Sequence, residues 1–244
     1  MSDAPAGRGG RLVLAVGLHG SASTWVFNVA REVLEQVAGA DAVDVCHATT
    51  AADVVAARRP GRTLVAKTHG WPELPAFAAA AGAVVLVSVR DPRDAALSLM
   101  QRFGDSLDVA VGGIGRDCLC IRACAASGHP VFRYEDRFFD DPATVGRIAD
   151  RLGVTLSPAQ AAAIFARWRT ERVRARAAAV RDLPADQRSA PDSPVLLERR
   201  TLVTSTHIGD GASGKWRQAF DPALQQRMSA FFRMVLLVFG YPLA

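Results

Sequence analysis

The sequence predicts an α/β fold, a three-layer sandwich with a central parallel sheet and helices on both faces. Short apolar runs alternate with segments of helical pattern through the first two-thirds of the chain, which is typical of strand–helix–strand units. The run at 83–89 is continuous and rich in β-branched residues. Such a run is expected of a strand that is buried on both faces, as the strands of a parallel sheet are.

The elements follow one another in the order that this fold requires. We expect five strands, at 11–16, 42–46, 63–66, 83–89 and 130–134. Helices are expected between and after them, at 21–37, 51–58, 73–81, 91–103 and 117–127. Pro92 suits the first turn of the fourth helix, because the amide hydrogen that proline lacks would have no partner there.

The last third of the chain has a different pattern. A long helix rich in Ala and Arg is expected at 158–180, and an amphipathic helix capped by Asp221 is expected at 222–239. Between them, the proline-rich stretch 184–194 within 182–200 is expected to be a mobile loop. Residues 1–10 are small and glycine-rich, so we expect a flexible tail there.

Composition indicates one globular domain, 1–244. Half of the 244 residues are hydrophobic and 22% are charged, so the chain can bury a core and is not expected to be disordered. The formal charge of +5 favours an anionic ligand. This excess is modest and spread along the chain, unlike the dense basic stripe of a nucleic-acid groove. We therefore expect no nucleic-acid partner.

Neither a membrane span nor a metal site is expected. The apolar runs at 12–18 and 228–241 are too short to cross a bilayer, and no signal-peptide cleavage site follows the first. The protein is therefore expected to be cytoplasmic. Cys118, Cys120 and Cys124 lie in an Ala-rich helical stretch without the paired knuckles of a zinc site. They are expected to be reduced, buried, apolar side chains.

The loop after the first strand has the composition of a phosphate cradle. It reads V-G-L-H-G-S-A-S-T-W at 16–25. Small residues let the backbone amides converge, and the helix that follows adds its positive N-terminal end. No Gly-Lys-Ser/Thr follows, so this is not the loop of ATP- and Mg²⁺-dependent enzymes. Taken alone, the pattern fits a tight turn with a helix cap equally well.

A second candidate anion site follows the strand at 83–89. Arg90 comes at the carboxyl end of this strand, where α/β proteins place their ligands. Its planar guanidinium suits a phosphate. Ser98 is eight residues further on, which brings both side chains to one face of the following helix. The alternative is a helix-start ion pair between Arg90 and an aspartate.

These motifs together resemble the cofactor signatures of the sulfotransferase family, whose fold is nucleotide-kinase-like. G-S-A-S-T-W at 20–25 and V-R-D-P-R-D-A-A-L-S-L at 89–99 resemble the two main signatures. Three further segments match in order: A-K-T-H at 66–69, F-R-Y-E-D at 132–136 followed by D-P at 141–142, and G-A-S-G-K-W-R at 211–217. The five matches span residues 13–217 and so cover most of the chain.

The resemblance implies that the cofactor is 3′-phosphoadenosine-5′-phosphosulfate (PAPS), with PAP as its product. It implies a set of cofactor-binding residues, which are His19, Gly20, Ser21, Ala22, Ser23, Thr24, Trp25, Arg90, Ser98, Tyr134, Gly211, Gly214, Lys215 and Trp216. Residues 21–24 would hold the 5′-phosphosulfate, and Arg90 with Ser98 the 3′-phosphate. Trp25 would stack on the adenine, Tyr134 would lie near it, and 211–216 would fold over the 3′-phosphate. Alternatively, Trp25 and Tyr134 are core residues, and Trp216 fixes its own loop.

The chemistry implied is transfer of a sulfuryl group to an acceptor hydroxyl or amine without a metal. His69 is the candidate general base, because a neutral imidazole accepts a proton near neutral pH. Lys67 is the candidate cation for the leaving group. Two residues apart on an extended segment, these side chains are expected to point to the same side. The alternative is that His69 is only a polar residue at a strand end.

Three departures from the family pattern bear on activity. Gly20 stands where many sulfotransferases have Lys or Arg, Ala22 stands in place of a loop glycine, and His207-Ile208-Gly209-Asp210 lacks the usual Arg-Lys. Leaving-group stabilisation would then rest on His19, Lys67 or Lys215. Losing one such contact would cost on the order of 100-fold in rate.

Other functions and several acceptors remain open. A small-molecule kinase-like enzyme is disfavoured by the missing Walker lysine, and a non-catalytic nucleotide-binding module is the second alternative. The composition resembles that of a high-GC bacterial protein, so the acceptor is expected to be a small molecule, glycan or glycolipid. Residues 158–180 and 184–194 are the expected acceptor-side elements. The sequence carries no signal for oligomeric state.

Overall fold

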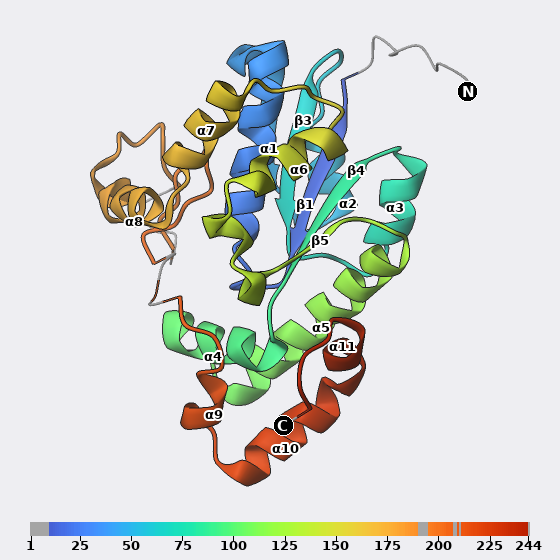
Figure 1. Ribbon diagram of the computed structural model, residues 1–244, viewed down its shortest axis with the longest axis vertical. Coiled ribbons are helices and arrows are strands. Elements are labelled where there is room, and N and C mark those ends of the chain that lie inside the picture. The colour runs from blue at the N-terminus through green and yellow to red at the C-terminus, as the bar shows by residue number, and fades with distance from the viewer. Residues whose placement is uncertain (1–9, 190–194, 207–208, 210, 244) are drawn as a thin grey trace.

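The fold is a three-layer α/β sandwich around a parallel sheet (Figure 1). The structure is a computed structural model, and it describes residues 10–189, 195–206, 209 and 211–243. Within these residues five strands form one sheet in the order β2-β3-β1-β4-β5, and every neighbouring pair is parallel. The strands are β1 Leu12–Gly17, β2 Val43–His47, β3 Thr63–Thr68, β4 Val84–Val89 and β5 Val131–Arg133. The predicted fold class and all five predicted strands are confirmed.

Central strand β1 determines where a ligand can bind. Its residues are all buried, and they pair with β3 on one side and β4 on the other, with Val13 opposite both Val65 and Val84. The chain leaves β1 towards β2 and β3 and later returns to the other side at β4. In open α/β sheets such a reversal of strand order opens a crevice at the carboxyl ends of the two strands. Here these ends are Gly17 and Val89.

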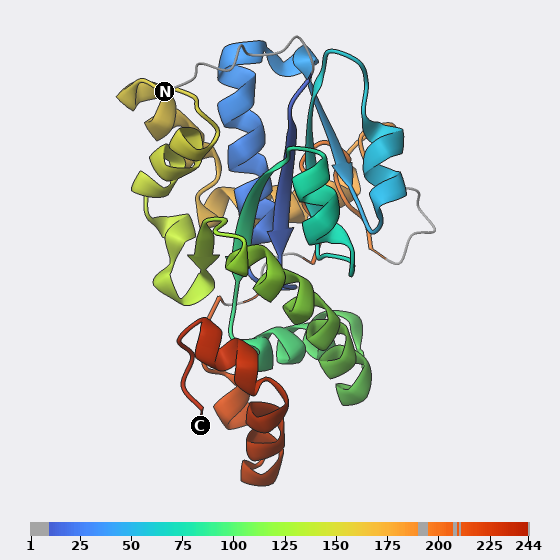
Figure 2. The same ribbon diagram turned by 90° about the vertical axis from the view of Figure 1, so that its right-hand side faces the viewer.

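Alternate residues of β1 face two separate cores, as the pleat of a strand requires. Val13 and Ala15 pack with α1 (Ser23–Ala38), α6 (Ala143–Arg151) and α7 (Pro158–Arg167). Leu12, Leu14 and Val16 face the opposite core, which includes residues of α2 (Ala51–Ala57), α3 (Leu74–Ala80) and α5 (Leu107–Ala126). Figure 2 shows helices on both sides of the sheet. The prediction of helices on both faces is confirmed.

Helices in the first two-thirds agree with the expectation, except at α5. Helix α4 spans Pro92–Phe103, with Pro92 in its first turn as predicted. The helix expected at 117–127 begins ten residues earlier, at Leu107, where the Ser106 side chain accepts a hydrogen bond from the Val109 amide. Three glycines between 112 and 115 hide the helical pattern in the sequence, because glycine is a poor helix former. Packing of α5 against α4 compensates for this.

Both helices expected in the last third are broken in two. The long helix at 158–180 is instead α7 and α8 (Thr170–Ala179), separated at Trp168, which is 1% exposed. The closing helix is α10 (Pro222–Phe231) and α11 (Arg233–Val238), interrupted at the buried Phe232. In both places a buried aromatic residue turns into the core. The predicted cap is confirmed, since Asp221 accepts a hydrogen bond from the Leu224 amide at 2.8 Å.

The remaining sequence expectations fall partly outside the described residues. Residues 1–9 and 190–194 are among those not described, so the expected tail and the centre of the expected loop are not tested. The described flanks of that loop make two isolated antiparallel bridges, Arg188 with Glu198 and Leu197 with Thr204. Cys118, Cys120 and Cys124 are free thiols buried in α5, as predicted. No helix among the described residues is long and apolar enough to cross a membrane.

Candidate active site

A cavity of about 610 Å³ opens at the carboxyl ends of β1, β3 and β4. It lies where the reversal of strand order predicts a ligand site. Lys67 and His69 enter it from the end of β3, and Arg90 enters it from the end of β4. The loop after β1 and the first turn of α1 form another part of its wall. Three segments that are far apart in the sequence therefore converge on one space.

In the loop after β1, Ala22 adopts a left-handed backbone conformation that glycine usually adopts. Ala22 has φ 59° and ψ 28° and is the N-cap residue of α1. This left-handed conformation costs a non-glycine residue roughly 1–2 kcal/mol. Ser23 and Thr24 follow as the first helical residues, and both line the cavity. Amides of a first helical turn have no partner within the helix, so α1 presents an anion-binding end to the cavity.

The hydroxyl of Ser21 is engaged within the protein, and its contact with the 5′-phosphosulfate stays a prediction. The Ser21 side chain is fully buried, its Oγ lies 2.9 Å from Oγ of Ser88, and it does not line the cavity. The hydroxyl therefore ties the loop to β4. Glycine is needed at position 17, where the chain passes close to Ser88 and Ser23, because a Cβ there would lie 2.3 Å from Oγ of Ser88 and 2.4 Å from Cβ of Ser23.

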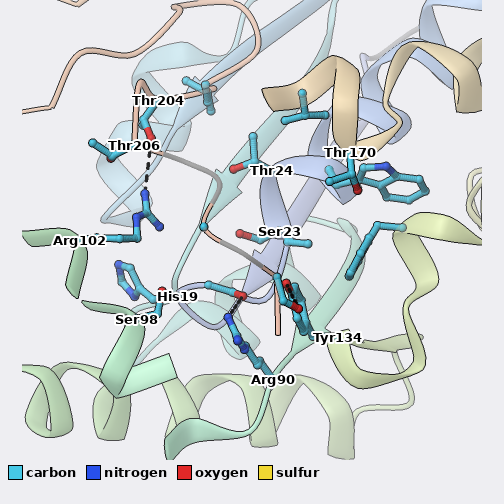
Figure 3. Close-up of a pocket in the computed structure, with 18 of the residues that line it drawn as sticks. His19, Ser23, Thr24, Arg90, Ser98, Arg102, Tyr134, Thr170, Thr204 and Thr206 are labelled. Carbon is cyan, nitrogen blue, oxygen red and sulfur yellow. Dashed lines mark hydrogen bonds between the residues drawn. The ribbon is translucent and has the colours of Figure 1, made fainter. Parts of the chain in front are cut away.

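Arg90 reaches across the mouth of the cavity without an acidic partner (Figure 3). Its Nη1 donates to the Gly20 carbonyl at 3.2 Å, and its Nη2 donates to the Ala212 carbonyl at 2.8 Å. The guanidinium also lies 4.3 Å from the centre of the Tyr134 ring. Its Nε is buried without a hydrogen-bond partner, and no carboxylate pairs with Arg90 among the described residues.

The helix-start ion pair belongs to Arg93 instead. Its Nη2 lies 2.7 Å from the Asp91 carboxylate, and this guanidinium is completely buried. The alternative considered for Arg90 is thus fulfilled by its neighbour three residues on. Gly20 lies beside both predicted 3′-phosphate ligands, since a Cβ there would be 3.4 Å from Oγ of Ser98 and 3.5 Å from Nη1 of Arg90. The structure therefore brings Arg90 and Ser98 together, as predicted.

Tyr134 and Trp25 line the same cavity and are also fixed by the core. The Tyr134 hydroxyl donates to the Gly211 carbonyl at 3.2 Å. Trp25 is 6% exposed, its Nε1 donates to the Trp168 carbonyl at 2.9 Å, and its ring packs edge-on against Phe138. Both rings are therefore held in place before any ligand arrives.

The segment 211–216 is fastened to α4 by one carboxylate. Asp94 accepts hydrogen bonds from the amides of Gly214 and Trp216. Gly211 and Lys215 line the cavity, whereas Gly214 and Trp216 do not. Trp216 is fully buried, with the Arg93 guanidinium 3.8 Å from its ring centre. The Trp216 ring therefore fixes the segment, and its cofactor contact stays a prediction. The upstream residues His207, Ile208 and Asp210 lie outside the described residues.

Lys67 and His69 face each other at the base of the cavity. The His69 Nδ1 lies 2.6 Å from the Gly17 carbonyl, so this nitrogen carries the ring hydrogen. The other ring nitrogen, Nε2, then accepts from the Lys67 ammonium at 3.0 Å. The prediction that both side chains point to the same side is confirmed. Burial lowers the pKa of Lys67 to about 8, with a further contribution from the nearby Arg102. Burial and the Lys67 charge hold the pKa of His69 well below its usual value.

A second histidine lies against the first. The His19 ring stacks on His69 at 3.5 Å between centres, with 15° between the planes. Its Nδ1 lies 2.5 Å from the carboxylate of Asp117 on α5. This bond fixes the His19 ring and leaves its Nε2 without a partner among the described residues. His47 from β2 lies 6.1 Å from His69 between ring centres, and burial lowers its pKa to about 4.

His19, His69 and Asp117 place three ligand atoms within 4.8 Å of one another, which is close enough to hold a metal ion. Both nitrogens of His69 are engaged, however, one by a carbonyl and one by Lys67. A metal ion at this point would have to displace the ammonium group. The arrangement is that of a hydrogen-bonded cluster in which His69 has no free nitrogen for a metal ion.

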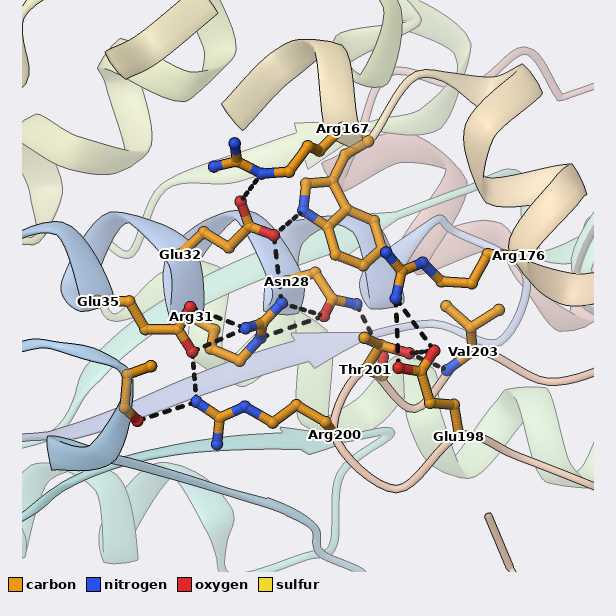
Figure 4. Close-up of polar contacts among 12 residues, drawn as sticks. Asn28, Arg31, Glu32, Glu35, Arg167, Arg176, Glu198, Arg200, Thr201 and Val203 are labelled. Atoms are coloured by element: carbon orange, nitrogen blue, oxygen red, sulfur yellow. Dashed lines mark hydrogen bonds and ion pairs between the residues drawn. The ribbon is translucent and has the colours of Figure 1, made fainter. Parts of the chain in front are cut away.

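The far wall of the cavity is attached to α1 through polar contacts (Figure 4). The fully buried Asn28 amide donates to the carbonyls of Thr24 and Thr201, at 2.8 and 2.7 Å. Glu35 accepts from Arg31 on its own helix and from Arg200. Residues 195–206, several of which line the cavity, are thereby held at a fixed distance from the cradle.

Several cavity residues were not singled out from the sequence. They are His47, Asp94, Arg102, Thr204 and Thr206, together with Asp117, which contacts the cavity residue His19. Arg102 carried a usable signal, because it follows Ser98 by one helical turn and therefore shares its face. Asp117 carried none, since it is 98 residues from the histidine that it contacts.

The five-stranded parallel sheet flanked by helices is an α/β fold with a cavity at the carboxyl ends of its strands. No family model matches the sequence, and no curated protein matches it. Solved structures do match. Mouse sulfotransferase SULT7A1 complexed with PAP aligns with a TM-score of 0.63 and 14% identity, over 93% of this chain and 84% of that chain.

Retinol dehydratase matches in two complexes. The complex with retinol and PAP has a TM-score of 0.60 and 15% identity, covering 92% of this chain and 81% of that chain. The complex with androsterone and the inactive cofactor PAP has a TM-score of 0.56 and 15% identity, covering 92% and 80%. The chain therefore has the fold of these PAP-binding proteins.

Proposed function

We propose that this protein is a sulfotransferase that moves a sulfuryl group from PAPS to a hydroxyl or amine of a small-molecule, glycan or glycolipid acceptor. The observation that carries the proposal is the placement of Arg90. Its buried guanidinium reaches the cavity beside Ser98 and bonds only to carbonyl groups among the described residues. A buried cation without a carboxylate favours an anionic ligand.

The cavity can receive both ends of a doubly phosphorylated adenosine. The first turn of α1, with the Ser23 and Thr24 hydroxyls, suits the 5′-phosphosulfate. Arg90 and Ser98 suit the 3′-phosphate, which plain adenylates lack. Trp25 and Tyr134 line the space that the proposal gives to the adenine. Gly211 and Lys215 line the same cavity and would complete the enclosure.

The reaction forms a bond between the acceptor oxygen or nitrogen and sulfur, and it breaks the bond between sulfur and the phosphate oxygen. The acceptor proton passes to His69, and PAP leaves with the bonding electron pair. His69 is neutral in the resting protein because its pKa is low, so it can act as a base.

In this proposal Lys67 first contacts His69 and then, once the cofactor binds, the phosphosulfate. In the resting protein its ammonium group occupies Nε2 of His69, the nitrogen that would take the proton. An anionic phosphosulfate draws the ammonium away, because a charged acceptor forms a stronger hydrogen bond than a neutral ring nitrogen. Lys67 then stabilises the leaving phosphate and releases His69 for catalysis. Cofactor binding thus activates the base.

The missing cradle cation favours one alternative, a nucleotide-binding module without catalysis. At Gly20 no side chain can contact the leaving phosphate, and a cation in a preorganised site contributes on the order of 100-fold in rate. The imidazole of His19, held by Asp117, is the nearest replacement in the loop. PAP binding without transfer to any acceptor would favour this alternative, whereas a Mg²⁺ requirement would favour the kinase-like one.

The test is a comparison of PAP with AMP by thermal shift and calorimetry. We expect wild-type protein to bind PAP at least 10-fold more tightly than AMP. Arg90→Gln should remove this preference and leave AMP binding unchanged. Arg227→Gln, a change of the same charge at an exposed residue of α10, is the matched control. Equal affinity of the wild-type protein for PAP and AMP would overturn the assignment of the cofactor.

A further inference from the structure

Arg102 projects into the cavity one helical turn beyond Ser98, and nothing in the proposed cofactor site uses it. Both residues lie on α4 and face the same space. Thr204 and Thr206 approach Arg102 from the opposite segment (Figure 3). The side chain is therefore aimed at the interior of the site.

The Arg102 guanidinium is poorly satisfied by the protein. Its hydrogen bond is a long one, from Nη2 to Oγ1 of Thr204 at 3.4 Å. Its Nε is buried without a hydrogen-bond partner, and no carboxylate pairs with it among the described residues. Burial lowers the pKa of Arg102. A guanidinium in this state is stabilised by any oxyanion that reaches it.

Neighbouring acidic groups cannot serve as that oxyanion. Asp94 is the acidic residue on the described cavity wall, and its two oxygens accept from the amides of Gly214 and Trp216. Asp117 is engaged by His19. Lys67 is close enough for the Arg102 charge to lower its pKa. Two cations that repel each other across a cavity form a site for an anion.

Arg102 lies away from the space proposed for the adenine. In Figure 3, Arg102, His19 and Ser98 lie on the side opposite Tyr134 and Thr170. Tyr134 and Trp25 border the space proposed for the adenine, and Arg90 with Ser98 marks the 3′-phosphate. An acceptor that approaches His69 from the opposite side would pass Arg102.

We propose that Arg102 binds an acidic group of the acceptor, so that the acceptor is a hydroxyl compound carrying a carboxylate, sulfate or phosphate. This inference rests on the proposed sulfotransferase function and narrows its acceptor class. A neutral acceptor that filled the cavity would remove the remaining water from the guanidinium without supplying a charged hydrogen-bond acceptor in its place. The sulfuryl group that is transferred could also supply an oxyanion to Arg102. The experiment below distinguishes this group from an acidic group of the acceptor.

The experiment uses two probes that differ in charge, 4-hydroxyphenylacetate and its neutral amide, 4-hydroxyphenylacetamide. Their binding to PAP-saturated protein is measured by calorimetry, and their sulfation is then measured with PAPS. We expect the anion to bind on the order of 10- to 100-fold more tightly than the amide, since hydrogen bonds to charged groups contribute this much. Arg102→Gln should bring the ratio close to one, and Arg102→Lys should restore part of it.

The controls separate this inference from the cofactor assignment. Arg227→Gln removes an exposed arginine that does not line the cavity and should preserve the ratio. The thermal midpoint of each variant with PAP checks that the site is folded. Equal binding of both probes to wild type, no binding of the anion at millimolar concentration, or a preference that survives in Arg102→Gln would overturn the inference. So would a loss of turnover in Arg102→Gln that is equal for both probes, which would assign Arg102 to the sulfuryl group. Failure of PAP to bind would instead refute the proposed function.

Discussion

The Lys67 ammonium nitrogen lies 3.0 Å from Nε2 of His69. This contact places the proposed leaving-group cation on the proposed base, so that neither acts until the other is released. Burial lowers the pKa of both groups from their usual values; the Arg102 charge lowers that of Lys67 further, and the Lys67 charge lowers that of His69 further. The pH dependence of the protein should report this pair.

We expect kcat/KM for PAPS to fall above about pH 8. The pKa of Lys67 in the free protein is about 8, and kcat/KM reports ionisation of the free protein. The fall should approach tenfold per pH unit at higher pH. The measurement is a pH profile under PAPS-limited conditions. Lys67→Met should lower the whole profile and remove the inflection; an unchanged inflection near pH 8 in that variant would show that another group causes it.

Stability should change in the opposite direction over the same interval. The pKa of Lys67 is about 8 when folded and 10.5 as its ordinary value. Between these values the unfolded state binds more protons, so the free energy of unfolding rises with pH. We expect wild type to gain stability relative to Lys67→Met from pH 8 to 10 in urea titrations. A gain confined to pH values below 7 would contradict the origin of the shift.

Replacement of the proposed base should separate catalysis from binding. His69→Asn keeps a polar group at this position but cannot accept the acceptor proton. We expect kcat to fall on the order of 10²- to 10⁴-fold, the usual contribution of a general base, while the Kd for PAP changes less than threefold. Turnover and calorimetry check the two parts. His47→Asn, a nearby histidine with no proposed role in the transfer, is the matched control. A kcat that survives in His69→Asn would transfer the role to His19.

Ala22→Gly should stabilise the protein by about 1 kcal/mol. Ala22 has φ 59°, a conformation that glycine adopts without the steric cost to Cβ, although glycine also gains entropy in the unfolded state. The measurement is urea-induced unfolding. Ala162→Gly, at an exposed position in the middle of α7, should destabilise by roughly the same amount. Equal losses in both variants would mean that the backbone at 22 carries no strain.

Asn28→Ala should destabilise the protein by about 2–3 kcal/mol and loosen the cavity. It leaves the buried carbonyl of Thr201 without its amide donor and removes the link to Thr24, and an unsatisfied buried group has a cost of this order. Gln36→Ala, on an exposed turn of the same helix, should change stability by less than 0.5 kcal/mol. Chemical denaturation gives both values. A loss below 1 kcal/mol for Asn28→Ala would show that the far wall is held by its ion pairs.

The sequence predicts most of what depends on local pattern. Apolar runs locate the five strands, and the signal is strongest for β1 and β4, which are buried on both faces and apolar almost throughout. The position of Arg90 at the end of such a run places it at the edge of the sheet where the cavity opens. The proximity of Lys67 and His69 follows from the twofold repeat of a strand.

Features that depend on distant partners could not be predicted. The helix expected at 158–180 breaks at Trp168, whose indole donates to Glu32, 136 residues away. Asp117 contacts His19 across 98 residues, from a helix whose start is hidden by glycines. Trp216 matches a motif by sequence, yet its contacts with Asp94 and Arg93 turn it into the core. Neither periodicity nor a short motif records such tertiary contacts.

The two carbonyl contacts of Arg90 have a consequence for how the pocket fills. Gly20 and Ala212 come from loops at opposite ends of the chain, and the guanidinium clasps both in the resting state. A phosphate that arrives there competes with neutral carbonyl oxygens, and its charged oxygens attract the guanidinium more strongly. An incoming anion can therefore replace the two carbonyl contacts of Arg90. Because no carboxylate among the described residues pairs with Arg90, the electrostatic attraction of its charge stays available for binding that anion.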